Sequence, residues 1–172
     1  KSAGFVPGLW LAPFSVESAS KLYKEHPDWL LQDDGGPLVQ WGVCALDLSH
    51  PEVLEFQRET FHRVFNEWGF DYVKLDFLVH AMAPARRYNP RMTSVQAFRQ
   101  AMGVIREVAG PERFILNCGA PIGASVGLCD GMRIGYDVSS RWHVPMNPEG
   151  WPLGNCCIRP AAIQTLWRQW MH

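Results

Sequence analysis

The stretch Tyr72-Val73-Lys74-Leu75-Asp76-Phe77 alternates apolar and charged side chains and predicts a β-strand. Successive side chains of a strand point to opposite faces, so Lys74 and Asp76 should share one face. The other face should carry the apolar residues Val73, Leu75 and Phe77. A parallel α/β barrel suits such a strand, because helices cover its outer face and the active site lies at the carboxyl ends of the strands. A solvated edge strand with a Lys/Asp pair is the alternative interpretation.

The composition is that of a globular domain with a substantial core: 172 residues, 47% hydrophobic and 19% charged. The net charge is −1 and the basic residues are scattered, which disfavours nucleic acid and anionic membranes as partners and favours a neutral substrate. The sequence has neither a long apolar run nor a signal-like amino terminus, and predicts a soluble chain. Eight tryptophans weakly favour a sugar-binding cleft, in which flat rings stack on pyranoses.

The cysteines and histidines predict neither a disulfide framework nor a metal site. Five cysteines, an odd number without repeated spacing, indicate reduced thiols and so favour a cytoplasmic protein. The six histidines show neither HxH nor HExxH spacing. We therefore expect no metal and no cofactor.

Two amphipathic helices are predicted on either side of the 72–77 strand. Ser49-His50-Pro51-Glu52 indicates a capping box with a proline in the first turn, and Gly69 ends this helix. The second helix begins at Thr93 or Ser94 and ends at Gly110. Their apolar stripes comprise Val53, Leu54, Phe61, Val64, Phe65 and Trp68 in the first, and Val95, Phe98, Met102, Ile105 and Val108 in the second.

Three further strands are predicted, over 9–13, where Pro13 ends the strand, over 114–118 and over 132–137, and a last helix over 160–171. Residues 33–37 form a turn within an elaborated loop. Only 13 residues separate Cys118 from Met132, too few for a full crossover helix. Four strands cannot close a barrel of eight. We therefore expect residues 1–172 to be a single partial catalytic domain, about half of a (β/α)8 TIM barrel and an internal piece of a longer protein.

Each predicted strand carries a candidate functional residue at or near its end: Trp10, Asp76, Cys118 and Asp137. Two carboxylates on different parallel strands fit retaining glycoside hydrolysis, in which they lie about 5 to 5.5 Å apart. Lys74 should keep Asp76 ionised as the nucleophile, and Asp137 should start protonated as the acid. Arg133 should then face substrate hydroxyls instead of Asp137. Spacing alone is not specific for this chemistry.

Several motifs together resemble the melibiase-type α-galactosidases of glycoside hydrolase clan D. They are GLWLAPFSVE (8–17), HPDWLL (26–31), ALDLSHPEVLEF (45–56), WGFDYVKLDFL (68–78), CGAP (118–121) and DGMRIGYDVSSRW (130–142). The resemblance covers most of the chain in the family's order. It implies a (β/α)8 barrel that removes terminal α-linked galactose from oligosaccharides by a retaining double displacement.

The resemblance also assigns roles to residues. It makes Asp76 of the KxD motif the nucleophile and Asp137 of the RIGxD motif the general acid/base. It makes Lys74, Cys118 and Arg133 contacts for galactose hydroxyls and Trp10 a wall of the cleft. The chain departs from the family's usual pattern at Tyr136 and at 139–141, and it lacks the first strands of the barrel, whose aspartates bind the sugar's 4- and 6-hydroxyls in relatives.

Three other functions stay open. A galactosyl transferase of the raffinose-synthase kind and an α-N-acetylgalactosaminidase use the same two carboxylates. A catalytically silent sugar-binding or scaffold fragment belongs to a different class, because an incomplete barrel exposes strand edges and its inner face. The expected partners are α-galactosides, with a homo-oligomer of the full-length protein as a further possibility.

Overall fold

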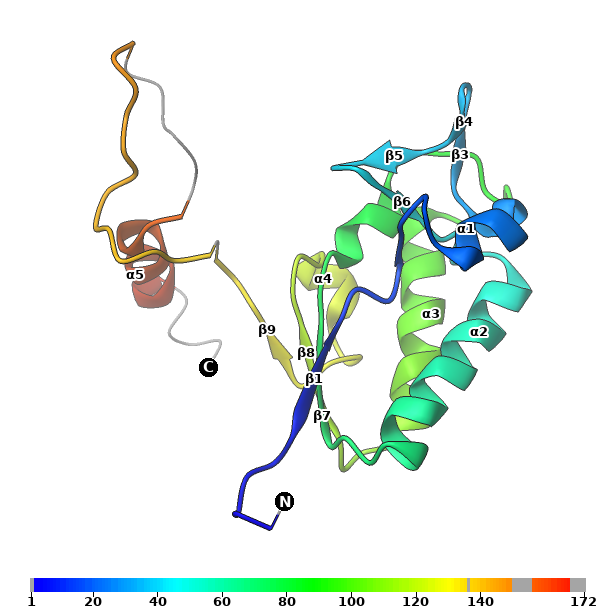
Figure 1. Ribbon diagram of the computed structural model, residues 1–172, viewed down its shortest axis with the longest axis horizontal. Helices are drawn as coiled ribbons and strands as arrows, with labels where there is room; N and C mark the ends of the chain where they lie inside the picture. Colours follow the sequence, from blue (N-terminus) through cyan, green and yellow to red (C-terminus); the bar gives the residue numbers. More distant parts are fainter. Residues whose placement is uncertain (1, 136, 150–155, 168–172) are drawn as a thin grey trace. The chain divides into compact units, whose positions relative to one another are not determined.

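The computed structural model describes residues 2–135, 137–149 and 156–167 (Figure 1). The chain forms two compact units, Lys1–Met132 and Arg133–His172. Among the described residues, no helix combines the length and apolar character needed to cross a membrane. The structure describes all five cysteines, and none of them forms a disulfide.

The first unit is built on a parallel sheet of four strands in the order β1-β7-β8-β9. The strands are β1 (Gly8–Leu11), β7 (Tyr72–Leu75), β8 (Phe114–Asn117) and β9 (Gly131–Met132). The register places Trp10 opposite Lys74 and Lys74 opposite Leu116. The four predicted strands are thus confirmed as parallel neighbours in one sheet.

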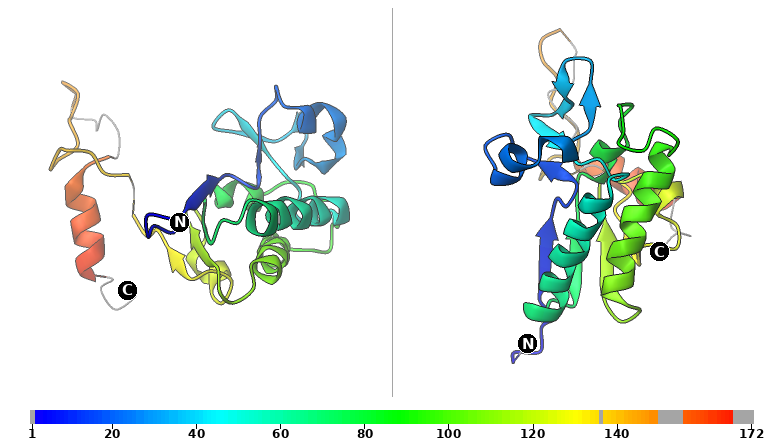
Figure 2. Two further views of the ribbon diagram at one scale, coloured as in Figure 1. Left: turned by 60° about the horizontal axis from the view of Figure 1, so that its bottom comes forward. Right: turned by 90° about the vertical axis from the view of Figure 1, so that its right-hand side faces the viewer.

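Two helices cover one face of this sheet and lie alongside each other (Figures 1 and 2). The first, α2 (Pro51–His62), continues into a π-helical turn over Arg63–Glu67, and the second is α3 (Ser94–Ala109). Val73, Leu75 and Ile115 are fully buried beneath them. The apolar half of the 72–77 pattern therefore packs under helices, as the sequence predicts.

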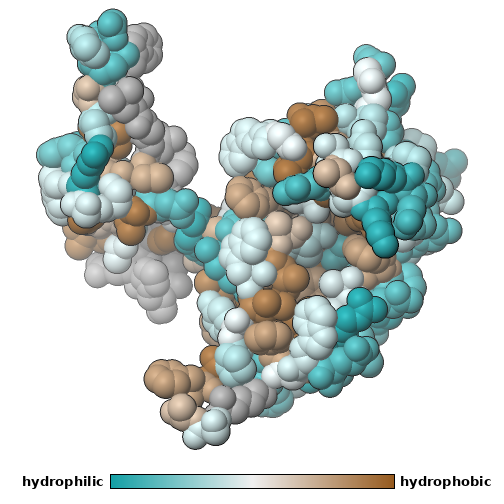
Figure 3. Space-filling view, viewed as in Figure 1, coloured by the Kyte–Doolittle hydropathy of each residue, from teal (hydrophilic) through white to brown (hydrophobic). Residues whose placement is uncertain are grey.

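The opposite face of the sheet is only partly covered by the described residues. Tyr72 and Phe114, which are paired in the register, stack on this face with ring centroids 5.4 Å apart. Phe114 is 42% exposed. Figure 3 shows apolar side chains gathered on the surface over this sheet. The sheet thus has one buried and one open side.

Small elements form a rim between β1 and α2. An antiparallel sheet has the order β2-β6-β5, and β3 and β4 form a separate hairpin around the turn predicted at 33–37. The bounds are β2 (Ser15–Val16), α1 (Lys21–Glu25), a 3-10 turn (Pro27–Trp29), β3 (Gln32–Asp33), β4 (Gly36–Pro37), β5 (Val39–Gln40) and β6 (Val43–Ala45). The elaborated loop of the prediction is therefore an ordered structure.

The connections after β7 and β8 each contain a short helical element. A 3-10 helix, Leu78–Met82, follows β7, and the four-residue α4 (Ile122–Ser125) joins β8 to β9, which confirms a trimmed crossover. In the second unit α5 spans Ile158–Trp167. The predicted last helix therefore begins earlier than residue 160, and its predicted end at Met171, with Trp170, lies outside the described residues.

Three helix predictions are wrong in detail. The cap of α2 is His50, whose Nδ1 accepts a hydrogen bond from the Glu52 N–H, while the Ser49 hydroxyl donates to Asp47. Trp68 is exposed because the preceding π-helical turn, with its wider i→i+5 spacing, rotates it off the apolar stripe. Val95 is exposed at the outer end of its stripe, in the first turn of α3.

The bounds of all four predicted strands are also wrong in detail. β1 ends at Leu11 and β8 at Asn117, so residues 12–13 and 118 lie outside strands. Phe77 does not continue β7, because its φ of 54° is left-handed and turns the chain away from the sheet. β9 is two residues long, and none of residues 133–135 and 137 lies in a strand. β9 stands at the edge of the described sheet, where no further strand extends its pairing.

Candidate active site

The carboxylate of Asp76 lies directly after β7 and is held through both of its oxygens. Oδ2 accepts a hydrogen bond from the indole Nε1 of Trp10 at 3.1 Å and lies 3.6 Å from the Lys74 ammonium. Oδ1 accepts a hydrogen bond from the backbone N–H of Phe77 at 2.9 Å. The parallel register of β1 and β7 explains the first contacts, since it sets Trp10 beside Lys74. Asp76 and Lys74 share one side of the strand, as predicted.

Cys118 closes the site from the next strand. Its thiol is fully buried and hydrogen-bonds to Asp76, and its backbone N–H donates to the Leu75 carbonyl at 2.7 Å. Burial raises the pKa of Asp76, but the hydrogen bonds from Cys118, Trp10 and the Phe77 backbone and the charge of Lys74 outweigh it. The pKa therefore falls below its usual value, and Asp76 is a carboxylate at neutral pH.

Two left-handed residues shape the backbone around this carboxylate. Phe77 has a φ of 54° and Gly119, after β8, a φ of 53°. A Cβ on Gly119 would lie 3.4 Å from the Phe77 nitrogen and 3.5 Å from Asp76 Oδ1. The Gly119 carbonyl also accepts a hydrogen bond from the Val79 N–H at 2.7 Å. These contacts fix the turn that presents Asp76.

Aromatic rings surround the carboxylate, and the sequence predicts only one of them. Trp10 meets Phe77 edge to face, and Phe77 stacks on His80 with centroids 5.4 Å apart. His80 is buried, its Nδ1 lies 3.5 Å from the Ser15 hydroxyl, and burial lowers its pKa although Asp76 acts in the opposite sense. A histidine within the otherwise apolar run 77–83 is the signal that could have indicated this cluster.

Arg133 and Asp137 belong to the second unit, whereas Trp10, Lys74, Asp76 and Cys118 belong to the first. Arg133 Nη1 donates to Asp137 Oδ1 at 2.5 Å, and the Asp137 side chain is 72% exposed. Arg133 is therefore paired with Asp137, because opposite charges four residues apart attract each other, and its contact with substrate hydroxyls stays a prediction. Asp130 has another partner, Arg106 on α3.

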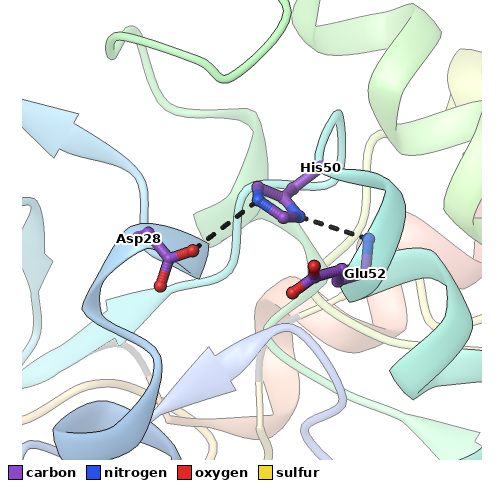
Figure 4. Close-up of side chains that lie close together, drawn as sticks. All are labelled: Asp28, His50 and Glu52. Atoms are coloured by element: carbon purple, nitrogen blue, oxygen red, sulfur yellow. Dashed lines mark hydrogen bonds and ion pairs between the residues drawn. The ribbon is translucent and has the colours of Figure 1, made fainter.

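In the part of the chain that the structure describes, one group of side chains has the spacing of metal ligands. It comprises Asp28, His50 and Glu52, whose ligand atoms all lie within 4.8 Å of one another (Figure 4). The contacts of these three side chains with other protein groups account for their closeness without a metal ion. His50 Nδ1 accepts the Glu52 N–H at 3.2 Å, which leaves Nε2 to face Asp28 at 3.8 Å. Glu52 accepts a hydrogen bond from the Trp29 indole at 3.0 Å. This group caps α2 and ties it to the rim.

A family model described as Melibiase matches residues 1–110. Alpha-galactosidase 2 of Pediococcus pentosaceus is 28% identical over 120 residues, which cover 66% of this chain and 17% of that protein. The structure of TtGalA, an alpha-galactosidase from Thermus thermophilus in complex with stachyose, is 37% identical with a TM-score of 0.78. That match covers 98% of this chain and 37% of the other.

A second solved structure is similar over a shorter part. The GH36 alpha-galactosidase AgaA from Geobacillus stearothermophilus is 28% identical with a TM-score of 0.55, over 68% of this chain and 17% of that one. This chain thus spans well under half the length of the relatives it matches. The family model covers more than half of this chain and includes β1, β7 and Asp76. The chain belongs to the melibiase family.

Proposed function

We propose that this chain supplies catalytic residues of a retaining α-galactosidase that removes terminal α-linked galactose from oligosaccharides. One observation carries the proposal: an ionised carboxylate, Asp76, held by four donors or charges at the carboxyl end of a parallel strand in a melibiase-family chain. TtGalA, one related alpha-galactosidase, binds stachyose in one solved structure and p-nitrophenyl α-D-galactopyranoside in another, which supports the same substrate class here.

We propose further that residues 1–172 are part of a (β/α)8 barrel. The described sheet is parallel, is covered by helices on one face and leaves Tyr72 and Phe114 partly open on the other. Parallel sheets are normally buried on both faces. Additional strands would pair with the free edges of β1 and β9 and enclose this open face.

Asp76 is the nucleophile in this proposal. One of its oxygens attacks the anomeric carbon and forms a C–O bond while the glycosidic C–O bond breaks. Because Trp10 and Phe77 donate to different oxygens, the carboxylate plane is fixed before the substrate arrives, which lowers the cost of reaching the reactive geometry. Lys74 keeps Asp76 charged, and a charged carboxylate is the nucleophilic form.

Asp137 is the general acid/base. It gives its proton to the departing oxygen and later takes a proton from the water that releases galactose. Arg133 Nη1 donates a hydrogen bond to Asp137 Oδ1, so in this proposal Arg133 leaves Asp137 and binds galactose hydroxyls when substrate binds. Lys74 and Cys118 contact galactose hydroxyls as well, and Trp10 is a wall of the cleft.

The decisive experiment uses the full-length protein with Asp76→Ala and Asp137→Ala on an activated aryl α-galactoside. We expect Asp76→Ala to abolish turnover and azide to restore it with β-galactosyl azide as product. Asp137→Ala should lower turnover about 10²–10⁴-fold. With azide it should give α-galactosyl azide, because its nucleophile is intact. Asp34→Ala, in the exposed β3–β4 turn, is the matched control and should keep parental activity.

Each other outcome has a definite meaning. Parental activity in either variant would overturn the carboxylate assignment. A parent that transfers galactose to sucrose or another sugar faster than to water would be a transferase of the raffinose-synthase kind. Preference for N-acetylgalactosaminides would change the sugar. A folded parent without turnover on any α-glycoside would be a silent sugar-binding or scaffold protein.

A further inference from the structure

Trp41 is the most exposed tryptophan among the described residues, at 82%, and it stands at the tip of a hairpin. Gln40 of β5 pairs with Val43 of β6, so Trp41 and Gly42 form a two-residue turn. Both have positive φ, 52° and 83°. This is the conformation that hairpin turns usually build from Asn-Gly or Gly-Gly.

A tryptophan at this position lowers stability on two counts. A left-handed φ brings the Cβ of any residue other than glycine too close to the backbone, so this conformation is strained for tryptophan. The indole also remains largely in water, so little burial offsets that strain. Residues held in such conformations are enriched at ligand-binding sites, where another function maintains them.

The ring of Trp41 is held in place by the aromatic cluster next to Asp76. It meets Phe77 edge to face at 6.5 Å and His80 edge to face at 5.1 Å. His80 is buried under Phe77, and its Nδ1 lies 3.5 Å from the Ser15 hydroxyl on β2. Phe77 and His80, three residues apart at the 3-10 helix after β7, therefore fix the orientation of an otherwise exposed indole.

The rings form a row that leads away from the carboxylate. Trp10 donates to Asp76, Phe77 meets the edge of Trp10 at 6.3 Å, and Trp41 meets Phe77. Trp10 thus lies beside the reacting carboxylate, and Trp41 lies two ring contacts further out. A sugar whose anomeric carbon is at Asp76 would occupy the space beside Trp10, and the next sugar would extend along the row.

We propose that Trp41 is a binding platform for the leaving-group sugar, the pyranose on the far side of the bond that is cleaved. This inference rests on the proposed function and adds the substrate class: α-galactosyl oligosaccharides over galactosides of small alcohols. The axial C–H groups of a pyranose form a flat apolar patch that matches an indole face, and burying both against each other removes apolar surface from water. Such stacking requires no charged side chain, which suits a neutral sugar.

The test compares Trp41→Ala, Trp41→Phe and the parent in the full-length protein on raffinose and on methyl α-galactoside. We expect Trp41→Ala to lower kcat/KM for raffinose about tenfold, the equivalent of one good aromatic contact, with little change for methyl α-galactoside. Trp41→Phe should recover part of the loss. Trp68→Ala removes another exposed tryptophan, one without a ring contact to this cluster. It should leave kcat/KM unchanged for both substrates.

Two results would overturn the inference. An equal loss on both substrates would mean that Trp41 supports the fold or the nucleophile and contacts no leaving-group sugar. Parental kcat/KM values of Trp41→Ala on both substrates would mean that the platform is unused. Failure of the proposed function is a separate result, because the parent would then hydrolyse neither raffinose nor methyl α-galactoside.

Discussion

The indole Nε1 of Trp10 donates a hydrogen bond to Asp76 Oδ2 at 3.1 Å, and the two residues come from adjacent parallel strands. A donor to a carboxylate stabilises its charged form and lowers its pKa. This contact therefore gives Trp10 an electrostatic role in addition to its proposed role as a wall of the cleft.

We predict that Trp10→Phe moves the acid limb of the kcat/KM profile of the full-length protein to higher pH. Phenylalanine keeps a ring but has no N–H, so Asp76 takes up its proton at a higher pH, and the protonated acid is not a nucleophile. Profiles of the variant and the parent across the acid and neutral range measure the shift. Trp68→Phe is the matched control, and an acid limb that is the same in all three proteins contradicts the prediction.

Gly119→Ala should destabilise the protein and reduce its turnover. Gly119 has a left-handed φ of 53°, a conformation in which any residue with a Cβ is strained. The substitution should therefore lower the free energy of unfolding by about 1 kcal/mol or more. The new methyl group would also lie against Phe77 and Asp76 Oδ1, and relief of the strain would move the nucleophile.

The control for this substitution lies nearby in the chain. Gly123, inside α4, has no atom near its would-be Cβ, so Gly123→Ala should be neutral or stabilise by about 0.5–1 kcal/mol. Urea unfolding and kcat measured on the two variants separate the effects. Similar behaviour of the two alanine variants would mean that the Gly119 conformation is unimportant.

Much of the fold could be predicted from the sequence because its elements follow simple periods. The alternation in 72–77 and the stripe of α3 correctly predicted a sheet face buried under helices. The errors occur where one residue changes the local geometry. The π-helical turn before Trp68 and the left-handed Phe77 both depend on tertiary contacts that no short window of sequence contains.

The site was predictable in part for the same reason. Strand parity put Lys74 and Asp76 on one side, but only the register of β1 with β7 and β8 brings Trp10 and Cys118 to the carboxylate. The roles of Trp41 and His80 depend on a small rim sheet that looked like a loop in the sequence. Asp137 lies in the second unit, and its catalytic role stays a prediction.

The loop after Asp76 is fastened by a buried ion pair between Arg87 and Asp47. Their side chains are 5% and 2% exposed, with Arg87 Nη1 3.6 Å from Asp47 Oδ1. Asp47 also accepts hydrogen bonds from the Ser49 hydroxyl and the Tyr88 backbone, and Arg87 donates to the Ala81 carbonyl at 3.0 Å. This network joins the start of α2 to residues 81–88.

We predict that Asp47→Asn costs about 3–5 kcal/mol of unfolding free energy, because it leaves the Arg87 charge buried without its partner. Turnover should fall as well, since the loop follows the nucleophile. Urea unfolding and kcat report the two effects. Glu107→Gln, the control, breaks the exposed ion pair with Arg58 and should change the unfolding free energy and kcat little. Equal stability of the two variants would show that the buried pair is dispensable.

His80 makes the aromatic cluster sensitive to acid. Burial lowers its pKa, so the folded protein holds a neutral imidazole while an unfolded chain takes up a proton near pH 6.5. The stability of the folded protein therefore carries no cost from His80 protonation above about pH 6.5. Stability is lost as the pH falls toward the lower pKa of His80 in the folded state.

We predict that His80→Gln reduces the fall in melting temperature between neutral and mildly acidic pH, since glutamine cannot take up this proton. Melting curves at several pH values measure the slope. His62→Gln, on the exposed side of α2, controls for the loss of an imidazole. A slope in His80→Gln as steep as in the parent would show that protonation elsewhere destabilises the fold, and that His80 supports Phe77 and Trp41 equally well in either charge state.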